Sequence, residues 1–301
     1  MTYDDVVSAI FTAPPDPALV PEPVKHGSAA RRLRDAIEPL AMHSVWSRRT
    51  NEVLAGCGLD FLTAYVAGRA AALGRPEPSV VAATFAVFEP GTITATYEAG
   101  RRACARDRLV AERQQATTES LHEVLDPVDV GPIVATLRRA IDGASPLGRP
   151  LFAGLASQPW PQDEVAQLWR CCELLREHRG DGHVAVLVAE GLDGVEANIV
   201  TELWLGMPLG SYSATRGWSS DQLLAASARL RDRGVLNDGV LSLEGQDLRV
   251  RVEQATDRAE RTVVEAIGDD LDRVVEQLSE WSALCVKAGA FPPDPYKRAA
   301  G

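Results

Sequence analysis

Residues 230–245 read LRDRGVLNDGVLSLEG, and this stretch decides how the second half of the chain is expected to fold. Gly234 is placed to end the helix that precedes it. Two short apolar pairs then flank residues 237–239 (Asn-Asp-Gly), where the Asp-Gly step is typical of a two-residue hairpin turn. Ser242 and Glu244 are suited to open another helix. The stretch therefore predicts a helix, a tiny two-stranded hairpin and a second helix.

The rest of the chain is predicted to be helical. Apolar residues recur mostly at helical spacing, and glycines and prolines mark the breaks. The predicted fold class is therefore all-α, with a small hairpin. The helices expected along the chain cover residues 29–56, 61–73, 79–90, 92–125, 133–141, 163–178, 183–190, 195–205, 219–233, 245–267 and 269–288.

Proline and glycine also suggest where the chain divides. Residues 1–28 hold a short helical pattern and then several prolines, so we expect an N-terminal arm. The stretch 143–161 contains Pro146, Gly148, Pro150, Pro159 and Pro161 and is typical of a linker. We therefore predict a helical domain over 29–145 and a second domain over 146–290 that carries the hairpin. The Pro-rich tail, 291–301, is expected to stay unpacked.

Two segments about 124 positions apart resemble each other. Gly56-Cys57-Gly58 and Gly180-Asp181-Gly182 are each followed by an Ala-rich helical pattern that ends in glycine, a polar turn, and an apolar helix that ends at proline. This pattern indicates an internal duplication. Short helical hairpins in Ala-rich chains also look alike without common origin, so both interpretations stay open.

Composition and charge bound the function. Of the 301 residues 46% are hydrophobic and the formal net charge is -11, so a large core is expected and a disordered chain is not. An acidic chain repels phosphates, which argues against wholesale nucleic-acid binding. No apolar run of membrane-spanning length and no signal peptide is visible, and the five unpaired-looking cysteines favour a reducing compartment. A cytoplasmic protein without a membrane partner is expected.

The segment 177–183 (EHRGDGH) concentrates polar chemistry. Its side chains include His178, Arg179, Asp181 and His183, and the glycines predict a tight turn between two helices. Imidazoles and carboxylates can act as acid, base or metal ligand, and arginine can clamp a carboxylate or phosphate. The two histidines are five apart, however, which is not the helical i, i+4 metal spacing. A corner held by polar caps is the simplest interpretation, a ligand pocket comes second, and no catalytic residue or metal ligand is assigned.

Three further side chains are candidates for the same ligand pocket. His43 and Trp46 share a helix and would face that pocket if the two halves are pseudo-symmetric. Trp204 is one of several tryptophans in the second half that could line a small-molecule site. Burial in the core is the simpler explanation for all three. No phosphate loop, dinucleotide fingerprint, nucleophile elbow or zinc spacing is present, so the cofactor is unknown.

Several segments carry a resemblance to a known family. The most specific is residues 174–185, LLREHRGDGHVA; the others are 69–71, 148–153, 159–161, 216–219, 229–234 and 255–257. With these segments the chain resembles an actinobacterial helix-turn-helix-like family of similar length, distantly related to MarR regulators, over most of residues 29–290. The resemblance implies a helical fold whose C-terminal half is a winged helix. Because the family's role is poorly defined, it implies no mechanism.

DNA binding requires basic side chains near a recognition helix. Residues 180–215 contain no Lys or Arg but several acids, whereas the next helix carries Arg229, Arg231 and Arg233, the candidate DNA-binding residues. MarR-type regulators normally carry an arginine at the wing tip, and the hairpin predicted here has none. The acidic chain and bare tip argue against DNA binding, and the three arginines leave it open.

The leading hypothesis is a non-enzymatic, ligand-responsive winged-helix (MarR-like) protein that binds a small molecule and acts in transcription regulation. One alternative is a helical enzyme or a metal- or cofactor-binding protein that uses the His178–His183 turn. Another is a degenerate helix-turn-helix that serves only as an interaction scaffold. The amphipathic patterns over 245–267 and 269–288 would either support a homodimer or pack on the chain's own first half. The ligand and any DNA target are not identified by the sequence.

Overall fold

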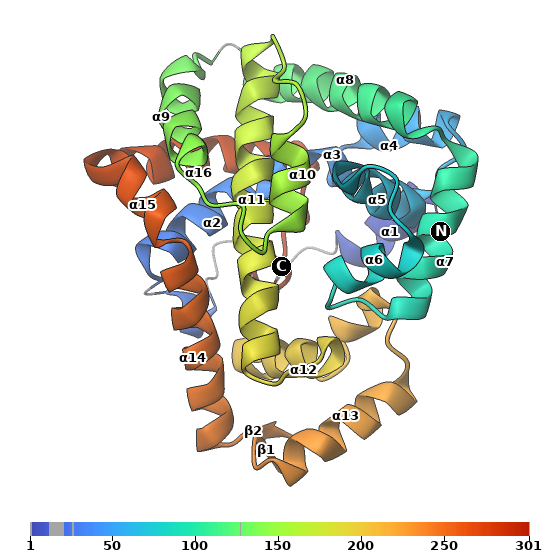
Figure 1. The fold of residues 1–301 in the computed structure, drawn as a ribbon, viewed down its shortest axis with the longest axis vertical. Coiled ribbons are helices and arrows are strands. Elements are labelled where there is room, and N and C mark those ends of the chain that lie inside the picture. Colours follow the sequence, from blue (N-terminus) through green and yellow to red (C-terminus); the bar gives the residue numbers. More distant parts are fainter. Residues whose placement is uncertain (1, 12–20, 26, 127, 301) are drawn as a thin grey trace.

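A computed structural model describes residues 2–11, 21–25, 27–126 and 128–300. Figure 1 shows an assembly of helices around one long central helix, with a small hairpin at one end. This arrangement confirms the all-α fold class with a tiny β-hairpin.

The first half of the described chain is entirely helical. Its α-helices are α1 (Tyr3–Ile10), α2 (Ala29–Ala41), α3 (His43–Trp46), α4 (Arg48–Gly56), α5 (Phe61–Ala70), α6 (Pro78–Thr84), α7 (Pro90–Ala103), α8 (Arg106–Leu125) and α9 (Gly131–Asp142). Short 3-10 turns lie at η1 (Glu22–Val24) and η2 (Ala71–Leu73).

The second half contains the central helix and the hairpin. Its α-helices are α10 (Pro150–Ala156), α11 (Glu164–Ala189), α12 (Gly194–Leu205), α13 (Ser220–Asp232), α14 (Leu243–Ala259), α15 (Arg261–Ile267), α16 (Leu271–Lys287) and α17 (Pro295–Ala300). The strands are β1 (Leu236–Asn237) and β2 (Val240–Leu241), and 3-10 turns lie at η3 (Ser213–Arg216) and η4 (Gly268–Asp270).

The predicted hairpin is confirmed. β1 and β2 are antiparallel, with Leu236 opposite Leu241 and Asn237 opposite Val240. The two turn residues, Asp238 and Gly239, both have positive φ, 49° and 80°. Positive φ at both central positions is what a type I′ hairpin turn requires.

The predicted turn at residues 179–182 is wrong, because α11 runs through it without a break. A glycine inside a helix costs about 1 kcal/mol relative to alanine. Here Gly180 and Gly182 are retained in a helix that is enclosed by α2, α9, α10 and α14. A Cβ at Gly182 would lie 3.1 Å from Nη2 of Arg149, so its bare backbone lets that guanidinium approach the helix. Tertiary packing outweighs local propensity at this point.

Three other predicted helices are each divided into shorter ones. The helix expected over 29–56 divides at Met42 and again at Ser47. The helix expected over 92–125 divides at Cys104, whose backbone is extended. The helix expected over 245–267 divides at Glu260, into α14 and α15.

The C-terminal tail is packed, contrary to the prediction. Over 295–300 it forms α17, in which Pro295 and Ala299 are buried. Arg31 Nη2 donates to the Ala299 carbonyl at 2.8 Å, and Arg34 Nη1 donates to the Arg298 carbonyl at 2.7 Å. Cations from α2 thus satisfy carbonyls at the helix C-terminus, where no further turn can donate an N–H to them.

The largest apolar cluster joins both halves of the chain. It includes Leu33 and Leu40 of α2, Trp169 of α11, and Leu278 and Trp281 of α16. The apolar side of α16 therefore packs on α2 within the same chain. The domain boundary at residue 146 stays a prediction, as does the internal duplication, although α4 ends at Gly56 whereas α11 continues past Gly180.

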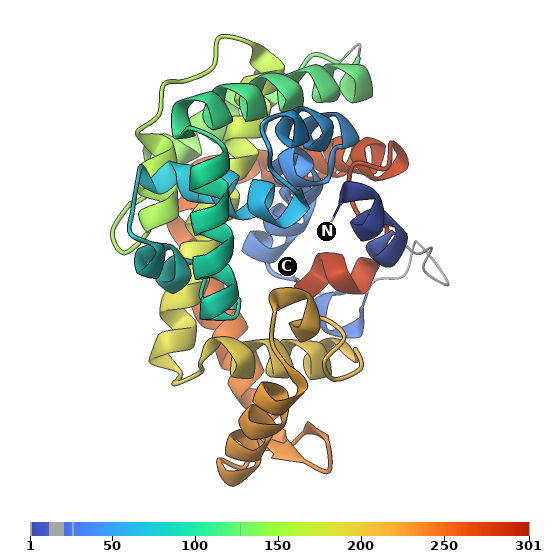
Figure 2. The same cartoon turned by 90° about the vertical axis from the view of Figure 1, so that its right-hand side faces the viewer.

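The hairpin has its own small core. Leu230 of α13, Leu236 of β1, Leu241 of β2 and Val252 of α14 pack against Ile199 of α12 in a second apolar cluster. We call residues 194–259, from α12 to α14, the hairpin unit. Figure 2 shows its α13 and hairpin projecting from one end of the molecule. None of the helices in the described ranges is apolar over enough length to span a membrane.

Candidate functional site

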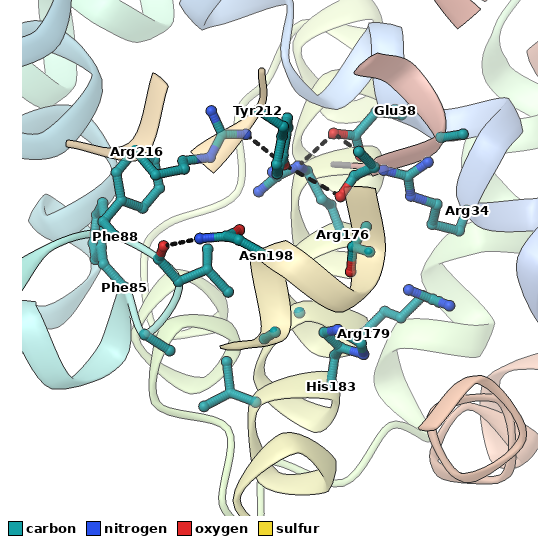
Figure 3. A pocket seen from close by; sticks show the side chains of 18 of the residues that line it. Arg34, Glu38, Phe85, Phe88, Arg176, Arg179, His183, Asn198, Tyr212 and Arg216 are labelled. Carbon is teal, nitrogen blue, oxygen red and sulfur yellow. Dashed lines mark hydrogen bonds and ion pairs between the residues drawn. The ribbon is translucent and has the colours of Figure 1, made fainter. Parts of the chain in front are cut away.

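An arginine-rich pocket lies where the hairpin unit meets the rest of the molecule (Figure 3). It is a cavity of about 140 Å³ whose walls come from α2, α5, α11, α12, α14, α17 and the segments 84–88 and 212–216. Seven of its lining residues are arginines and two are carboxylates: Arg31, Arg34, Arg69, Arg176, Arg179, Arg216 and Arg249 against Glu38 and Glu253. The pocket is thus cationic in a chain whose net charge is -11.

Helix α11 supplies one wall by its periodicity. Arg176, Arg179, Gly180 and His183 recur at intervals of three and four residues, so they lie along one face of the continuous helix. This face would not exist if the helix broke at 179–182 as predicted. The continuity of α11 is therefore what assembles the pocket.

The wall opposite is the segment 85–88, which is clamped onto the hairpin unit. Asn198 Nδ2 and Trp218 Nε1 both donate to the Val87 carbonyl, at 2.7 and 2.8 Å. A Cβ at Gly194 would lie 2.1 Å from the Ala86 carbonyl oxygen, so only glycine permits this approach. Ala86 itself has φ 29°, a conformation that L residues rarely adopt. The close fit fixes Phe85 and Phe88 relative to α12.

A buried carboxylate on α12 shapes the next wall. Glu202 accepts hydrogen bonds from the backbone amides of Gly210, Tyr212 and Ser213, at 2.9, 2.5 and 2.7 Å. Three amides around one carboxylate fix the loop that follows α12. The loop carries Arg216, whose guanidinium lies 4.9 Å from the Phe88 ring centre and 4.1 Å from that of Tyr212. Figure 3 shows this aromatic end of the pocket.

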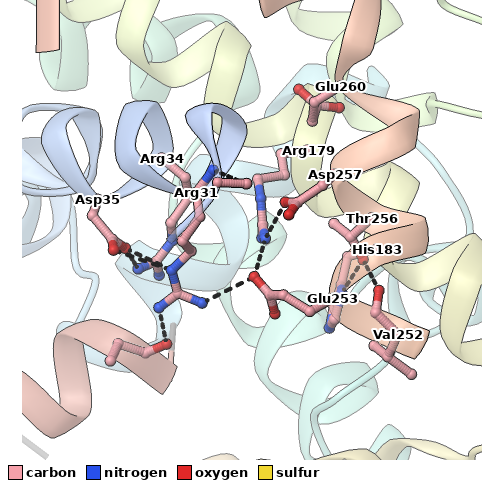
Figure 4. A network of polar contacts seen from close by, with 12 residues as sticks. Arg31, Arg34, Asp35, Arg179, His183, Val252, Glu253, Thr256, Asp257 and Glu260 are labelled. Atoms are coloured by element: carbon pink, nitrogen blue, oxygen red, sulfur yellow. Dashed lines mark hydrogen bonds and ion pairs between the residues drawn. The ribbon is translucent and has the colours of Figure 1, made fainter. Parts of the chain in front are cut away.

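At the other end, three arginines converge on Glu253 of α14. Figure 4 shows two of them, Arg31 and Arg179. Its carboxylate accepts from Arg31 at 3.3 Å, Arg179 at 3.0 Å and Arg249 at 2.7 Å. Burial alone would raise the pKa of Glu253, but Arg249, Arg179 and Arg31 hold that pKa well below its usual range. Burial in turn lowers the pKa of Arg179 and Arg249. One carboxylate thus serves three guanidinium groups.

His183 presents a neutral ring to the pocket. The Thr256 hydroxyl donates its single proton to the Val252 carbonyl, at 2.8 Å. Its oxygen therefore accepts from His183 Nδ1, at 2.9 Å. Burial, with Arg179 and Arg249, lowers the pKa of His183 to about 3. With Nδ1 as the donor, Nε2 carries a lone pair, and the described part of the chain provides no partner for it.

His178 and Asp181, also predicted as ligand residues, do not line the pocket. His178 is fully buried; its Nδ1 lies 2.8 Å from Oε1 of Glu260 and its ring stacks edge-on against Phe152. Asp181 accepts from the Phe152 amide at 3.0 Å, and burial raises the pKa of its carboxyl to about 6. Both side chains instead tie α10 and α14 to α11.

The remaining predicted ligand residues also lie outside the pocket lining. His43 is buried against Ser120, with Nε2 2.9 Å from the hydroxyl, and burial lowers its pKa to about 4. Trp46 packs among aromatic rings, including Phe61. Trp204 lies under the guanidinium of Arg249, 4.0 Å from its ring centre. A ligand role for these residues and for Arg179 and His183 stays a prediction, and the geometry brings only Arg179 and His183 into the pocket.

The three candidate DNA-binding arginines differ in their surroundings. Arg229 pairs with Asp193 at 2.5 Å and with Glu196 at 2.9 Å. Arg233 pairs with Glu196 at 3.1 Å and donates to the Gly191 carbonyl. Arg231 is exposed and makes no ion pair within the described ranges. The acidic start of α12 thus neutralises two of the three.

Most of the pocket could not be predicted from the sequence. Six of its arginines come from segments scattered over more than two hundred positions, so spacing could not join them: Arg31, Arg34, Arg69, Arg176, Arg216 and Arg249. The one available signal was the i, i+3, i+7 series of polar residues on α11. In the part of the chain that the structure describes, no group of three or more His, Cys, Asp or Glu could hold a metal ion.

The fold and the pocket define a helical protein in which a helix–hairpin–helix unit stands beside a cationic cavity. A family model described as "Helix-turn-helix family" matches residues 30–292. The chain therefore belongs to this helix-turn-helix family. Neither the comparison with curated proteins nor that with solved structures finds a match.

Proposed function

We propose that this protein is a ligand-responsive transcriptional regulator. In this proposal α12 and α13 are the helix-turn-helix, with α13 as recognition helix, and the hairpin is the wing before α14. The arginine-rich pocket is the ligand site. The observation that carries the proposal is that α12 and α14 each form a pocket wall on one side and support α13 and the hairpin on the other.

Helix α12 couples the two regions directly. Asn198 and Thr201 line the pocket, while Ile199 and Val200 belong to the hairpin core. Helix α14 repeats this arrangement, because Arg249 and Glu253 line the pocket while Leu248 and Val252 pack under the hairpin. A ligand that shifts or stiffens either helix must therefore change the packing that positions α13.

The surface of α13 sets what kind of DNA binding to expect. Arg231 is the exposed cation available for a phosphate. Asp221 and Asp232 on the same helix and Asp238 in the hairpin turn are exposed as well and add negative charge to this unit. Few phosphate contacts mean weak affinity and a shallow dependence on salt. We therefore expect binding to be measurable only at low ionic strength, or in a ligand state that frees Arg229 from its acidic partners.

One observation favours a second candidate, a helix-turn-helix that docks a protein in place of DNA. Leu224 on α13 is 66% exposed and Leu243, beside the hairpin, is 81% exposed. Large apolar side chains on the same unit are typical of an interaction surface. This candidate predicts no DNA affinity at any salt concentration.

The test is fluorescence anisotropy with labelled fragments of the DNA upstream of the protein's own coding sequence, at salt concentrations from low to physiological. The proposal predicts saturable binding that weakens with salt, and a lower affinity for Arg231→Gln. Arg261→Gln, at an exposed arginine at the start of α15 and outside the hairpin unit, is the matched control and should bind as the unaltered protein does. Flat anisotropy at the lowest salt would reject DNA binding and leave the interaction scaffold.

A further inference from the structure

We infer that the pocket binds a small organic anion that carries a flat apolar group and a hydrogen-bond donor. The inference rests on the proposed ligand-responsive function, since it names the ligand class of that same site. The negative charge, the flat apolar group and the hydrogen-bond donor are each complementary to a different part of the pocket wall.

The excess of arginine calls for an anion. Seven guanidinium groups and two carboxylates line the cavity, and three further carboxylates, of Asp35, Glu177 and Asp257, pair with lining arginines from behind the wall. Seven positive charges against five negative ones leave an excess of two. Buried charges without full compensation are costly, so a site of this composition gains free energy when an anion enters. Because the whole chain is acidic, the cationic pocket is a local reversal of charge that the surface does not share.

Arg216 is the best-placed anchor for that anion. In the described part of the chain its guanidinium has no carboxylate partner; its donors reach only Thr215 Oγ1 and the Tyr212 hydroxyl. Its Nε is buried and unpartnered. The rings of Phe88 and Tyr212 hold the planar group in place. A fixed, planar fork of donors matches a carboxylate or a phosphate.

The opposite end offers further unused donors. Arg179 and Arg249 share the carboxylate of Glu253, and in the described part of the chain the Nε atom of each is buried without a partner. Figure 4 shows Arg179 and Glu253 beside His183. The anion can therefore be bridged from either end of the cavity.

His183 asks for a hydrogen-bond donor on the ligand. Its Nδ1 proton is committed to Thr256, so Nε2 can only accept. A hydroxyl or amine on the ligand would satisfy Nε2.

The aromatic wall and the volume set the ligand's body. Tyr65 lies 6.0 Å from Phe85 and 5.7 Å from Phe88, measured between ring centres, and all three line the cavity. A cavity of roughly 150 Å³ holds a single benzene ring. At about 140 Å³, this pocket suits one ring or a body of similar size.

The test is isothermal titration calorimetry on the full chain with four probes. 4-Hydroxybenzoate carries the anion, ring and donor; benzoate lacks the donor, and 4-hydroxybenzamide lacks the charge. 4-Hydroxyphenyl phosphate replaces carboxylate by phosphate, so the tighter of the two hydroxylated anions identifies the acid group. We expect both hydroxylated anions to bind about 10-fold or more tightly than the amide, and benzoate to bind more weakly than 4-hydroxybenzoate.

Two variants assign the contacts. Arg216→Gln should weaken both anions about 10-fold and leave the amide unchanged. His183→Asn keeps an N–H for Thr256 but removes the Nε2 acceptor, so it should abolish the preference for 4-hydroxybenzoate over benzoate. Arg261→Gln, at an exposed arginine at the start of α15 that does not line the pocket, is the control and should bind every probe as the unaltered protein does. Thermal melts of each variant verify folding.

The inference is overturned if the amide binds as tightly as the anions, if Arg216→Gln and Arg261→Gln behave alike, or if no probe binds at millimolar concentration. Its failure differs from failure of the proposed function. Anion binding through Arg216 with no DNA binding would keep the inference and reject the regulator. DNA binding without anion binding would do the reverse.

Discussion

Replacing Glu253 by glutamine removes the one carboxylate that three pocket arginines share. The variant keeps the shape of the side chain and one acceptor oxygen but loses the charge. In the unaltered protein Arg31, Arg179 and Arg249 donate to the Glu253 carboxylate at 3.3, 3.0 and 2.7 Å. In the variant they keep their positive charges in a largely buried site but face a neutral amide. Breaking a buried charged network in this way is strongly destabilising.

The magnitude follows from burial. Removing one partner of a buried ion pair costs about 3–5 kcal/mol. The lower end applies to Glu253, because its side chain is 17% exposed and the amide oxygen still accepts one hydrogen bond. We therefore expect the free energy of unfolding to fall by about 3 kcal/mol, roughly a 6 °C lower Tm for a chain of this size.

The contribution of Glu253 to the free energy of unfolding should depend on pH. The pKa of Glu253 is lower in the folded than in the unfolded state, so its contribution is present above the unfolded-state pKa of about 4.3. That contribution is lost as the pH falls through the folded-state pKa. The difference between Glu253→Gln and the unaltered protein should therefore be full at pH 7 and shrink in strong acid.

Urea unfolding followed by circular dichroism, at pH 7 and in acid, measures both effects. Glu276→Gln, at an exposed position of α16, is the matched control, and it should change stability by less than about 0.5 kcal/mol. A loss below about 1 kcal/mol for Glu253→Gln at pH 7 would show that the three arginines do not depend on this carboxylate.

The remaining predictions concern the fold around the pocket. Leu230→Ala empties a fully buried site in the hairpin core and should lower the free energy of unfolding by about 2–5 kcal/mol, measured by urea denaturation. Asp181→Asn mimics the protonated carboxyl, and burial raises the pKa of Asp181 to about 6. The variant should therefore stabilise the protein by about 1 kcal/mol at pH 8 and not at pH 4. Equal effects at the two pH values would contradict this prediction. Gly194→Ala places a methyl group 2.1 Å from the Ala86 carbonyl oxygen and should lower Tm, whereas Gly56→Ala, with open space around its Cβ, should not.

Local chemistry explains which elements the sequence could predict. The hairpin follows from Asp238-Gly239, since the turn residues themselves impose the backbone. The break predicted in α11 rested on Gly180 and Gly182, whose low helix propensity is a local signal. Packing overrode it, because the guanidinium of Arg149 occupies the space beside Gly182. A contact between residues so far apart in the sequence cannot be deduced from the spacing of residues along the chain.

The candidate site was predictable only in part, for the same reason. Arg179 and His183 belong to the segment that sequence analysis singled out, and both line the pocket. His178, five residues before His183, points elsewhere because α11 does not bend. Arg31 and Arg216 reach the pocket from α2 and from the loop after α12, and only the folded chain brings them together.

The central claim is that the pocket and the recognition helix communicate through α12 and α14. The most direct measurement is the DNA affinity of the full chain, by anisotropy at low salt, while the tightest anionic probe is titrated in. Linked sites typically change each other's affinity about 5-fold or more, and the DNA must change the probe's affinity by the same factor. We predict such a reciprocal change, displaced to higher probe concentration by Arg216→Gln; a DNA affinity that stays constant while the pocket fills would contradict the claim.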